Sequence, residues 1–93
     1  YGEVKSGPTV LAFANYELGQ ANFPAGFLKS SPQALPFGIE LAFATTTIQA
    51  DYDKALQAGA ISVQPIQQKP WGQQVAYVRD NNGFLIELCT PMG

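Results

Sequence analysis

The sequence predicts an α+β fold, and residues 38–90 carry its clearest pattern, which is strand, helix, strand, strand, strand. One helical pattern, residues 48–58, lies between segments rich in alternating or β-branched residues. The tetrapeptide DNNG, residues 80–83, separates the last two strands and is typical of a hairpin, because Asn and Gly tolerate positive φ. Residues 1–16 add only two further strands to this module.

The residues before the module divide into a strand pair and a connection. Strands are expected at residues 1–6 and 9–16, where β-branched and aromatic residues form short runs around the turn SGP. Residues 17–37 contain three prolines and two glycines, and they predict a long linker. We therefore expect a single domain, with residues 1–16 before the linker and the module at residues 38–93. The linker also carries apolar side chains that are expected to pack on another part of the chain: Phe23, Phe27 and Leu28.

Within the module, four strands are expected to accompany one helix. The helix has apolar residues four, seven and eight positions after Ile48, follows threonines that can cap its first amides, and ends before Gly59. Pro65 cannot donate a hydrogen bond to a neighbouring strand, so its strand is expected at an edge of the sheet. The expected strands are residues 37–45, 60–66, 72–79 and 84–89.

Composition excludes several classes of protein. The chain has 93 residues, of which 46% are hydrophobic and 13% charged, as is typical of one small globular domain. Its net charge is −2 and its five cations are scattered, so we do not expect a nucleic-acid partner. No apolar run approaches the ~20 residues that cross a bilayer, so no membrane partner is expected. A single cysteine cannot form an internal disulfide, which favours the cytoplasm.

The candidates for chemistry are two carboxylates. The chain has no histidine, which removes Ser-His-Asp and Cys-His catalysis and the common zinc sites. Cys89 therefore lacks a histidine base, and we expect it to be a small buried residue. Glu40 and Glu87 lie within apolar strands, where a dry and unpaired carboxylate would be costly. Both are expected to face either a ligand or solvent.

Side-chain alternation places the two carboxylates on one face of the sheet. Ile86 and Leu88 are expected to face the helix, so that Glu87 faces away from it, and Glu40 faces the same way as Glu87. With a two-residue hairpin loop, Ala76 would lie opposite Glu87 and leave space above the carboxylate. A wall that combines a carboxylate with open space is suited to ligand binding.

The segments ELAFATTTIQADYDKALQAGA and KPWGQQVAYVRDNNGFLIELCTP resemble the vicinal oxygen chelate superfamily, which includes glyoxalases, bleomycin resistance proteins and extradiol dioxygenases. Here RDNNGFLIEL stands in the place of the common RDPDG-x-x-IEL. The resemblance implies paired β-α-β-β-β modules that form a half-barrel cup around the ligand. It also implies that residues 1–16 are the remnant of a first module that lacks its opening strand and helix, so that we expect an upstream segment.

The resemblance also implies where a metal would lie. Metal-dependent members place His in the module's first strand and Glu in IEL, positions that Glu40 and Glu87 occupy here. A faint internal repeat that sets Gly7 against Gly83 aligns Leu11 with Glu87, and Leu11 cannot ligate. We therefore expect neither a metal nor a cofactor, as in the bleomycin-resistance-like branch.

Three functions remain open at this point. The first is sequestration of a cationic or aromatic compound such as an antibiotic, by a cytoplasmic homodimer. The second is a lyase or isomerase of the glyoxalase type in which Glu87 or Glu40 acts as a general base. The third is a non-catalytic dimerisation module. Aromatic side chains such as Tyr16 would add stacking surface. The residues expected to contact a ligand are Glu40, Glu87, Trp71, Tyr77, Phe13 and Leu11.

Overall fold

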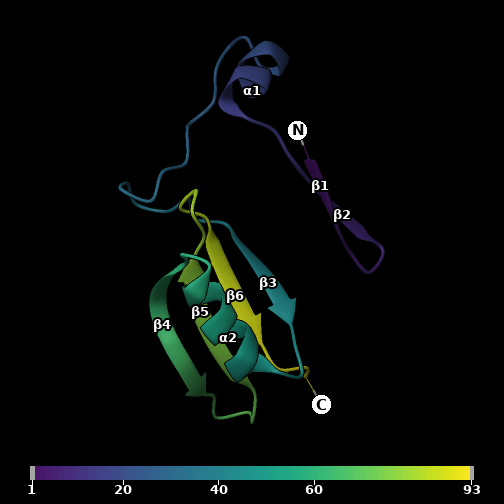
Figure 1. The fold of residues 1–93 in the computed structure, drawn as a ribbon, viewed down its shortest axis with the longest axis vertical. Helices are drawn as coiled ribbons and strands as arrows, with labels where there is room; N and C mark the ends of the chain where they lie inside the picture. The colour runs from purple at the N-terminus through teal and green to yellow at the C-terminus, as the bar shows by residue number, and fades with distance from the viewer. Residues whose placement is uncertain (1, 93) are drawn as a thin grey trace.

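A mixed four-stranded sheet and one helix form the body of the molecule (Figure 1). This computed structural model describes residues 2–92. Helix α2 (Ile48–Gln57) lies across one face of the sheet. Strands β3 and β6 are parallel and the other neighbours are antiparallel, which confirms the predicted α+β class. The strands in spatial order are β3 (Glu40–Ala44), β6 (Leu85–Cys89), β5 (Gln74–Arg79) and β4 (Ile61–Gln68).

The core lies between α2 and the sheet. Tyr52 is buried on α2 and packs against Ala76 and Val78 of β5. Its hydroxyl also shares a 2.6 Å hydrogen bond with the Ser62 hydroxyl. On β6, Ile86 and Leu88 pack against the same cluster, as side-chain alternation predicted. The residue between Ile86 and Leu88 in the sequence therefore points to the face of the sheet opposite α2.

The predicted helix α2 and edge strand β4 are confirmed, although β4 is shifted by one residue at its start and two at its end, and the helix cap differs in detail. Gly59 follows the helix with a φ of 104°, and β4, which contains Pro65, is an edge strand. Thr47 is the N-cap residue, but its side chain accepts no hydrogen bond from a helix amide. The hydroxyls of Thr45 and Thr47 instead donate to the carboxylate of Asp51, which lies in the first turn.

The N-terminal residues form a hairpin with its own small sheet. Strand β1 (Gly2–Ser6) pairs in antiparallel fashion with β2 (Thr9–Phe13), and the pair shares no sheet with the four strands of the body. In Figure 1 the hairpin extends beside β3. The molecule is correspondingly open, with a radius of gyration of 14.9 Å. A compact chain of this length would have a radius of about 12 Å.

Helix α1 (Tyr16–Asn22) corrects the sequence prediction, which placed a strand end and a linker there. The Asn15 side-chain oxygen accepts a 2.8 Å hydrogen bond from the Leu18 amide and so caps the helix. Residues 23–39 contain neither helix nor strand, as expected of a linker. Within residues 2–92, neither helix has the length and apolar character needed to cross a membrane.

The hairpin between β5 and β6 is confirmed, but its register differs from the prediction. The Asp80 carboxylate accepts hydrogen bonds from the amides of Asn82 and Phe84, which stabilises a loop of five residues, 80–84. The longer loop shifts the pairing, so that Tyr77 and not Ala76 lies opposite Glu87. A side chain with a hydroxyl therefore stands where open space was expected.

Arg79 fastens the linker to the tip of this hairpin. Its guanidinium donates hydrogen bonds to the carbonyls of Ser31 at 3.0 Å and Ala34 at 2.7 Å, and a longer one to Pro32 at 3.4 Å. Its Nε donates to the Gly83 carbonyl at 3.0 Å. One cation therefore joins two segments that lie 48 residues apart. We refer to these contacts as the Arg79 clamp.

Candidate functional site

Glu87 lies at the centre of β6 on the face of the sheet that α2 does not cover. Its neighbours Ile86 and Leu88 pack on the helix side, and alternation turns Glu87 the other way. The carboxylate is half-buried, and it accepts a 2.8 Å hydrogen bond from the Tyr77 hydroxyl of the adjacent strand. Ala42 of β3 lies beside Glu87 on the other flank, and its short side chain leaves that side open.

Glu40, at the start of β3, is electrostatically coupled to Glu87. It is an exposed residue, but partial burial of its carboxyl raises its pKa above the ordinary value of 4.5. The negative charge of Glu87 and a hydrogen-bonding interaction with its side chain raise the Glu40 pKa further. Glu40 therefore retains its proton to a higher pH than an isolated glutamate does.

Tyr77 and Cys89 complete this cluster as protonated groups. The hydrogen bond to Glu87, together with burial and the nearby negative charges, raises the pKa of Tyr77 to about 12. Burial, followed by a hydrogen bond to Glu87 and its charge, raises the pKa of the Cys89 thiol. Cys89 is buried, as predicted, and its thiol lies 3.7 Å from the Phe43 carbonyl. A buried thiol with a raised pKa is a poor nucleophile, which leaves the carboxylates as the reactive groups of the cluster.

The remaining predicted ligand residues lie in three other places, of which one, the hollow at Leu11, also includes Ala42, the neighbour of Glu87. Trp71 lies in the loop between β4 and β5, is 62% exposed, and donates from its indole nitrogen to Gln73. Leu11 lines a small hollow of about 170 Å³ with residues of β3. Phe13 lines a larger cavity of about 670 Å³. Of the predicted set, the structure therefore brings together Glu40, Glu87 and Tyr77.

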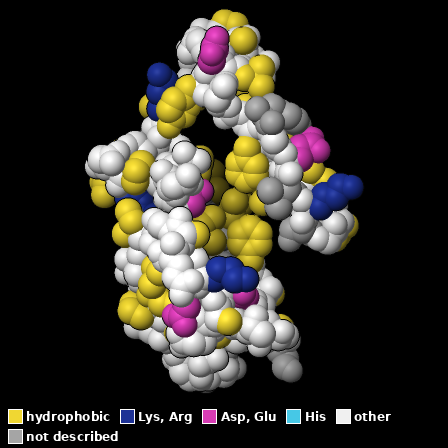
Figure 2. Space-filling model, viewed as in Figure 1, with side chains coloured by type: hydrophobic (Ala, Val, Ile, Leu, Met, Phe, Trp, Pro, Cys, Tyr) yellow, Lys and Arg dark blue, Asp and Glu magenta, His cyan; other side chains and the backbone are white. Residues whose placement is uncertain are grey.

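The larger cavity contains aromatic residues that the sequence analysis did not assign to a site. Figure 2 shows hydrophobic side chains gathered around a hollow between α1 and the sheet. The signal in the sequence is the group of phenylalanines in and after the linker, for which the sequence predicts only packing on another part of the chain. The residues that line the cavity are Gly2, Phe13, Ala14, Asn15, Tyr16, Gly19, Phe23, Phe27, Leu28, Ser30, Phe37, Asn82 and Phe84.

Two solved structures resemble this chain. The crystal structure of TioX from Micromonospora sp. ML1 matches with a TM-score of 0.52 and 27% sequence identity, over 62% of this chain and 55% of that one. A member of the Glyoxalase/bleomycin resistance protein/dioxygenase superfamily from Sphaerobacter thermophilus DSM 20745 matches with a TM-score of 0.52 and 23% sequence identity. This match covers 58% of this chain and 45% of that one. The fold of this chain is therefore similar to that of a vicinal oxygen chelate superfamily protein. The resemblance stated from the sequence motifs is thereby confirmed.

The chain covers about half of the length of these two solved structures. No family model and no curated protein matches the sequence. The matches cover about 60% of this chain and show a shared fold, whereas the activity of a whole vicinal oxygen chelate protein does not follow from a match of this extent.

The metal of the vicinal oxygen chelate superfamily does not fit the side chains present here. Within residues 2–92, no group of three or more His, Cys, Asp and Glu side chains is arranged to hold a metal ion. One oxygen of Glu87 already accepts a hydrogen bond from the Tyr77 hydroxyl, and the Leu11 side chain has no atom that can bind a metal. Two carboxylates alone make a poor site for a transition metal.

Proposed function

We propose that the protein binds a small organic molecule at the cluster of Glu40, Glu87 and Tyr77 and releases it unaltered. The observation that supports this function is the meeting of two carboxylates on the uncovered face of the sheet, next to the short side chain of Ala42. Partial burial and the negative charge of Glu87 raise the pKa of Glu40, and a bound cation would relieve the repulsion between the two carboxylates. The ligand class would be a cationic or hydrogen-bond-donating compound, as many antibiotics are.

The raised pKa of Glu40 also favours a second candidate, a lyase or isomerase in which Glu40 accepts a proton. Such a reaction places negative charge on the substrate as the proton leaves. Glu87 would oppose that charge, and the hydroxyl of Tyr77, which could stabilise it, already donates to Glu87. The same geometry that suits a bound cation is therefore unfavourable for a developing anion, and binding is the better supported function.

A matched pair of ligands tests the binding proposal. Benzylamine and benzyl alcohol share one ring, but only the amine is cationic at neutral pH. We expect isothermal titration to give about fivefold tighter binding of the amine, and the Glu87→Gln variant to remove this preference, because a partly exposed charge pair contributes about 1 kcal/mol. The glutamine retains an oxygen that can accept the Tyr77 hydrogen bond, so the variant is expected to fold.

The control for lost charge is Asp53→Asn, which removes a carboxylate from α2, on the other side of the sheet, and should leave the preference intact. In the unaltered protein the preference should shrink as the pH falls through the pKa of Glu40, which lies above 4.5, because the protonated carboxyl has no charge. An amine that binds no better than the alcohol at neutral pH would contradict the proposal.

We also propose that the protein is a homodimer. In support, the molecule is more open than a compact chain of its length, and large apolar side chains such as Val10, Leu35 and Ile39 are exposed along the hairpin and the segment after α1. Light scattering after size exclusion is expected to give a mass twice the 10.0 kDa of one chain. A mass equal to one chain at every concentration would refute the dimer.

A further inference from the structure

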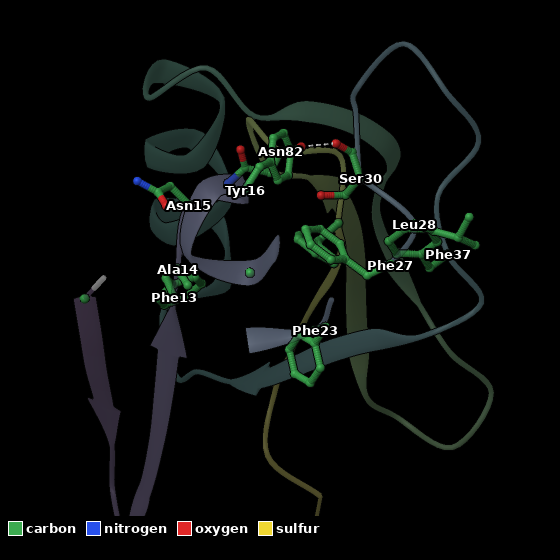
Figure 3. A pocket seen from close by; sticks show the side chains of 13 residues that line it. Phe13, Ala14, Asn15, Tyr16, Phe23, Phe27, Leu28, Ser30, Phe37 and Asn82 are labelled. Atoms are coloured by element: carbon green, nitrogen blue, oxygen red, sulfur yellow. Dashed lines mark hydrogen bonds between the residues drawn. The ribbon is translucent and has the colours of Figure 1, made fainter. Parts of the chain in front are cut away.

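The cavity of about 670 Å³ lies apart from the carboxylate cluster and has the size of a ligand site. Pockets that bind small molecules measure about 300–1,000 Å³ and are mostly apolar. The walls come from the end of β2, from α1, from the linker and from the tip of the β5–β6 hairpin, and Figure 3 shows their side chains arranged around one space. None of the residues described at this wall is charged, and neither Glu40 nor Glu87 is among them.

Aromatic rings make up most of the apolar wall. The rings of Tyr16 and Phe27 are 6.2 Å apart between centroids and tilted by 45°. Those of Phe37 and Phe84 are 6.0 Å apart and tilted by 59°. Phe27 is nevertheless 39% exposed and Phe84 36%, so ring surface remains uncovered. Uncovered aromatic surface around a common space favours a further ring, which can stack in an offset or edge-to-face arrangement.

The polar groups at the wall are few, and most already have partners. The Tyr16 hydroxyl donates to the Ser30 carbonyl, and the Asn15 side-chain oxygen accepts from the Leu18 amide. The side-chain amide of Asn82 has no hydrogen-bond partner within residues 2–92. It can therefore orient a ligand by one hydrogen bond at the edge of the cavity.

The walls are held in place without a ligand. The Arg79 clamp joins the linker to the hairpin tip that carries Asn82 and Phe84. The hydrogen bond from Tyr16 to Ser30 joins α1 to the other end of the same linker. A site whose walls are already fixed loses less conformational entropy when a ligand binds.

We propose that this cavity binds an uncharged, planar aromatic ring system. A cationic ligand is disfavoured because no carboxylate lines the wall to offset its loss of water, and because the Lys29 ammonium lies 5.2 Å from the centre of the Tyr16 ring. The proposal rests on the proposed function only in treating the protein as a small-molecule binder, since the two sites share no residue. A ligand that carries both an aromatic system and an amine would have a separate place for each part.

Nile red, a neutral planar dye whose fluorescence rises in apolar surroundings, is the probe for this site. We expect saturable binding to the whole chain, and about tenfold weaker binding to Phe84→Ala, which removes one ring of the wall. Trp71→Ala is the matched control, because it removes a larger exposed ring that does not line the cavity, and its affinity should stay within about twofold. Circular dichroism establishes that each variant is folded.

A second variant fills the cavity without removing any contact. Ala14→Trp adds a ring at an exposed wall position, so it should weaken Nile red binding even if Phe84→Ala does not fold. Glu87→Gln should leave the dye affinity unchanged, which separates failure of this site from failure of the carboxylate site. The proposal is overturned if the dye does not saturate, if Trp71→Ala loses as much affinity as Phe84→Ala, or if folded Ala14→Trp binds normally.

Discussion

Replacing Tyr52 by alanine is expected to lower the free energy of unfolding by about 3–5 kcal/mol, the cost of deleting a buried aromatic ring. Tyr52 is 9% exposed and packs against Ala76, which is fully buried, and Val78. Small domains have only about 5–15 kcal/mol of stability in total, so the variant should be close to unfolded. Urea denaturation followed by circular dichroism measures the difference.

The Tyr52→Phe variant separates the ring from the hydroxyl. It removes the hydrogen bond to Ser62 but keeps the packing, and it should cost about 1 kcal/mol. Ser62 is exposed, so water can replace the lost partner. If alanine destabilises the protein no more than phenylalanine does, the ring of Tyr52 does not form the centre of the core.

The elements of the module could be predicted because their signals are local. Alternation around Glu87 distinguishes the helix side of β6 from the uncovered side within five residues. Gly59 ends a helix and Pro65 excludes a central strand, and each effect follows from the backbone of one residue. Such features do not depend on what the rest of the chain does.

Loop length and helix α1 were predicted wrongly because competing local signals had similar strength. The sequence DNNG is typical of a two-residue turn. The Asp80 carboxylate instead accepts hydrogen bonds from the amides of Asn82 and Phe84, and these stabilise a loop of five residues. Around residue 16 the aromatic run favoured a strand, whereas the cap from Asn15 favoured a helix. A change of one residue in the pairing register was enough to put Tyr77 beside Glu87.

The two candidate sites differed in how far the sequence could predict them. Glu40 and Glu87 share a face, as side-chain alternation predicted, and the pairing of β3 with β6 puts them on adjacent strands. The aromatic cavity depends on contacts between distant segments, such as that of Arg79 with Ser31, 48 positions earlier. No periodicity or motif reports such a contact, so the cavity emerges only when the linker is placed in three dimensions.

Replacing Gly83 by alanine is expected to release the linker from the hairpin tip. Gly83 has a φ of 87°, and a Cβ atom there would lie 2.5 Å from the Ser31 carbonyl oxygen. An alanine at positive φ costs about 1–2 kcal/mol, and the steric conflict can be relieved only if the linker moves away from Arg79. We expect a total loss of about 3 kcal/mol by urea denaturation, with weaker binding of Nile red.

Gly72→Ala is the matched control for this change. Gly72 has a similar φ of 95°, but no atom lies within 4 Å of the position its Cβ would take. The free energy of unfolding of Gly72→Ala should therefore fall only by the backbone cost of about 1–2 kcal/mol, and its affinity for Nile red should be unchanged. Because the two variants share their backbone strain, any difference between them reports on the contact with Ser31. Equal losses of stability and equal dye binding would mean that the linker is not seated on the hairpin, and that the Arg79 clamp does not hold the cavity walls.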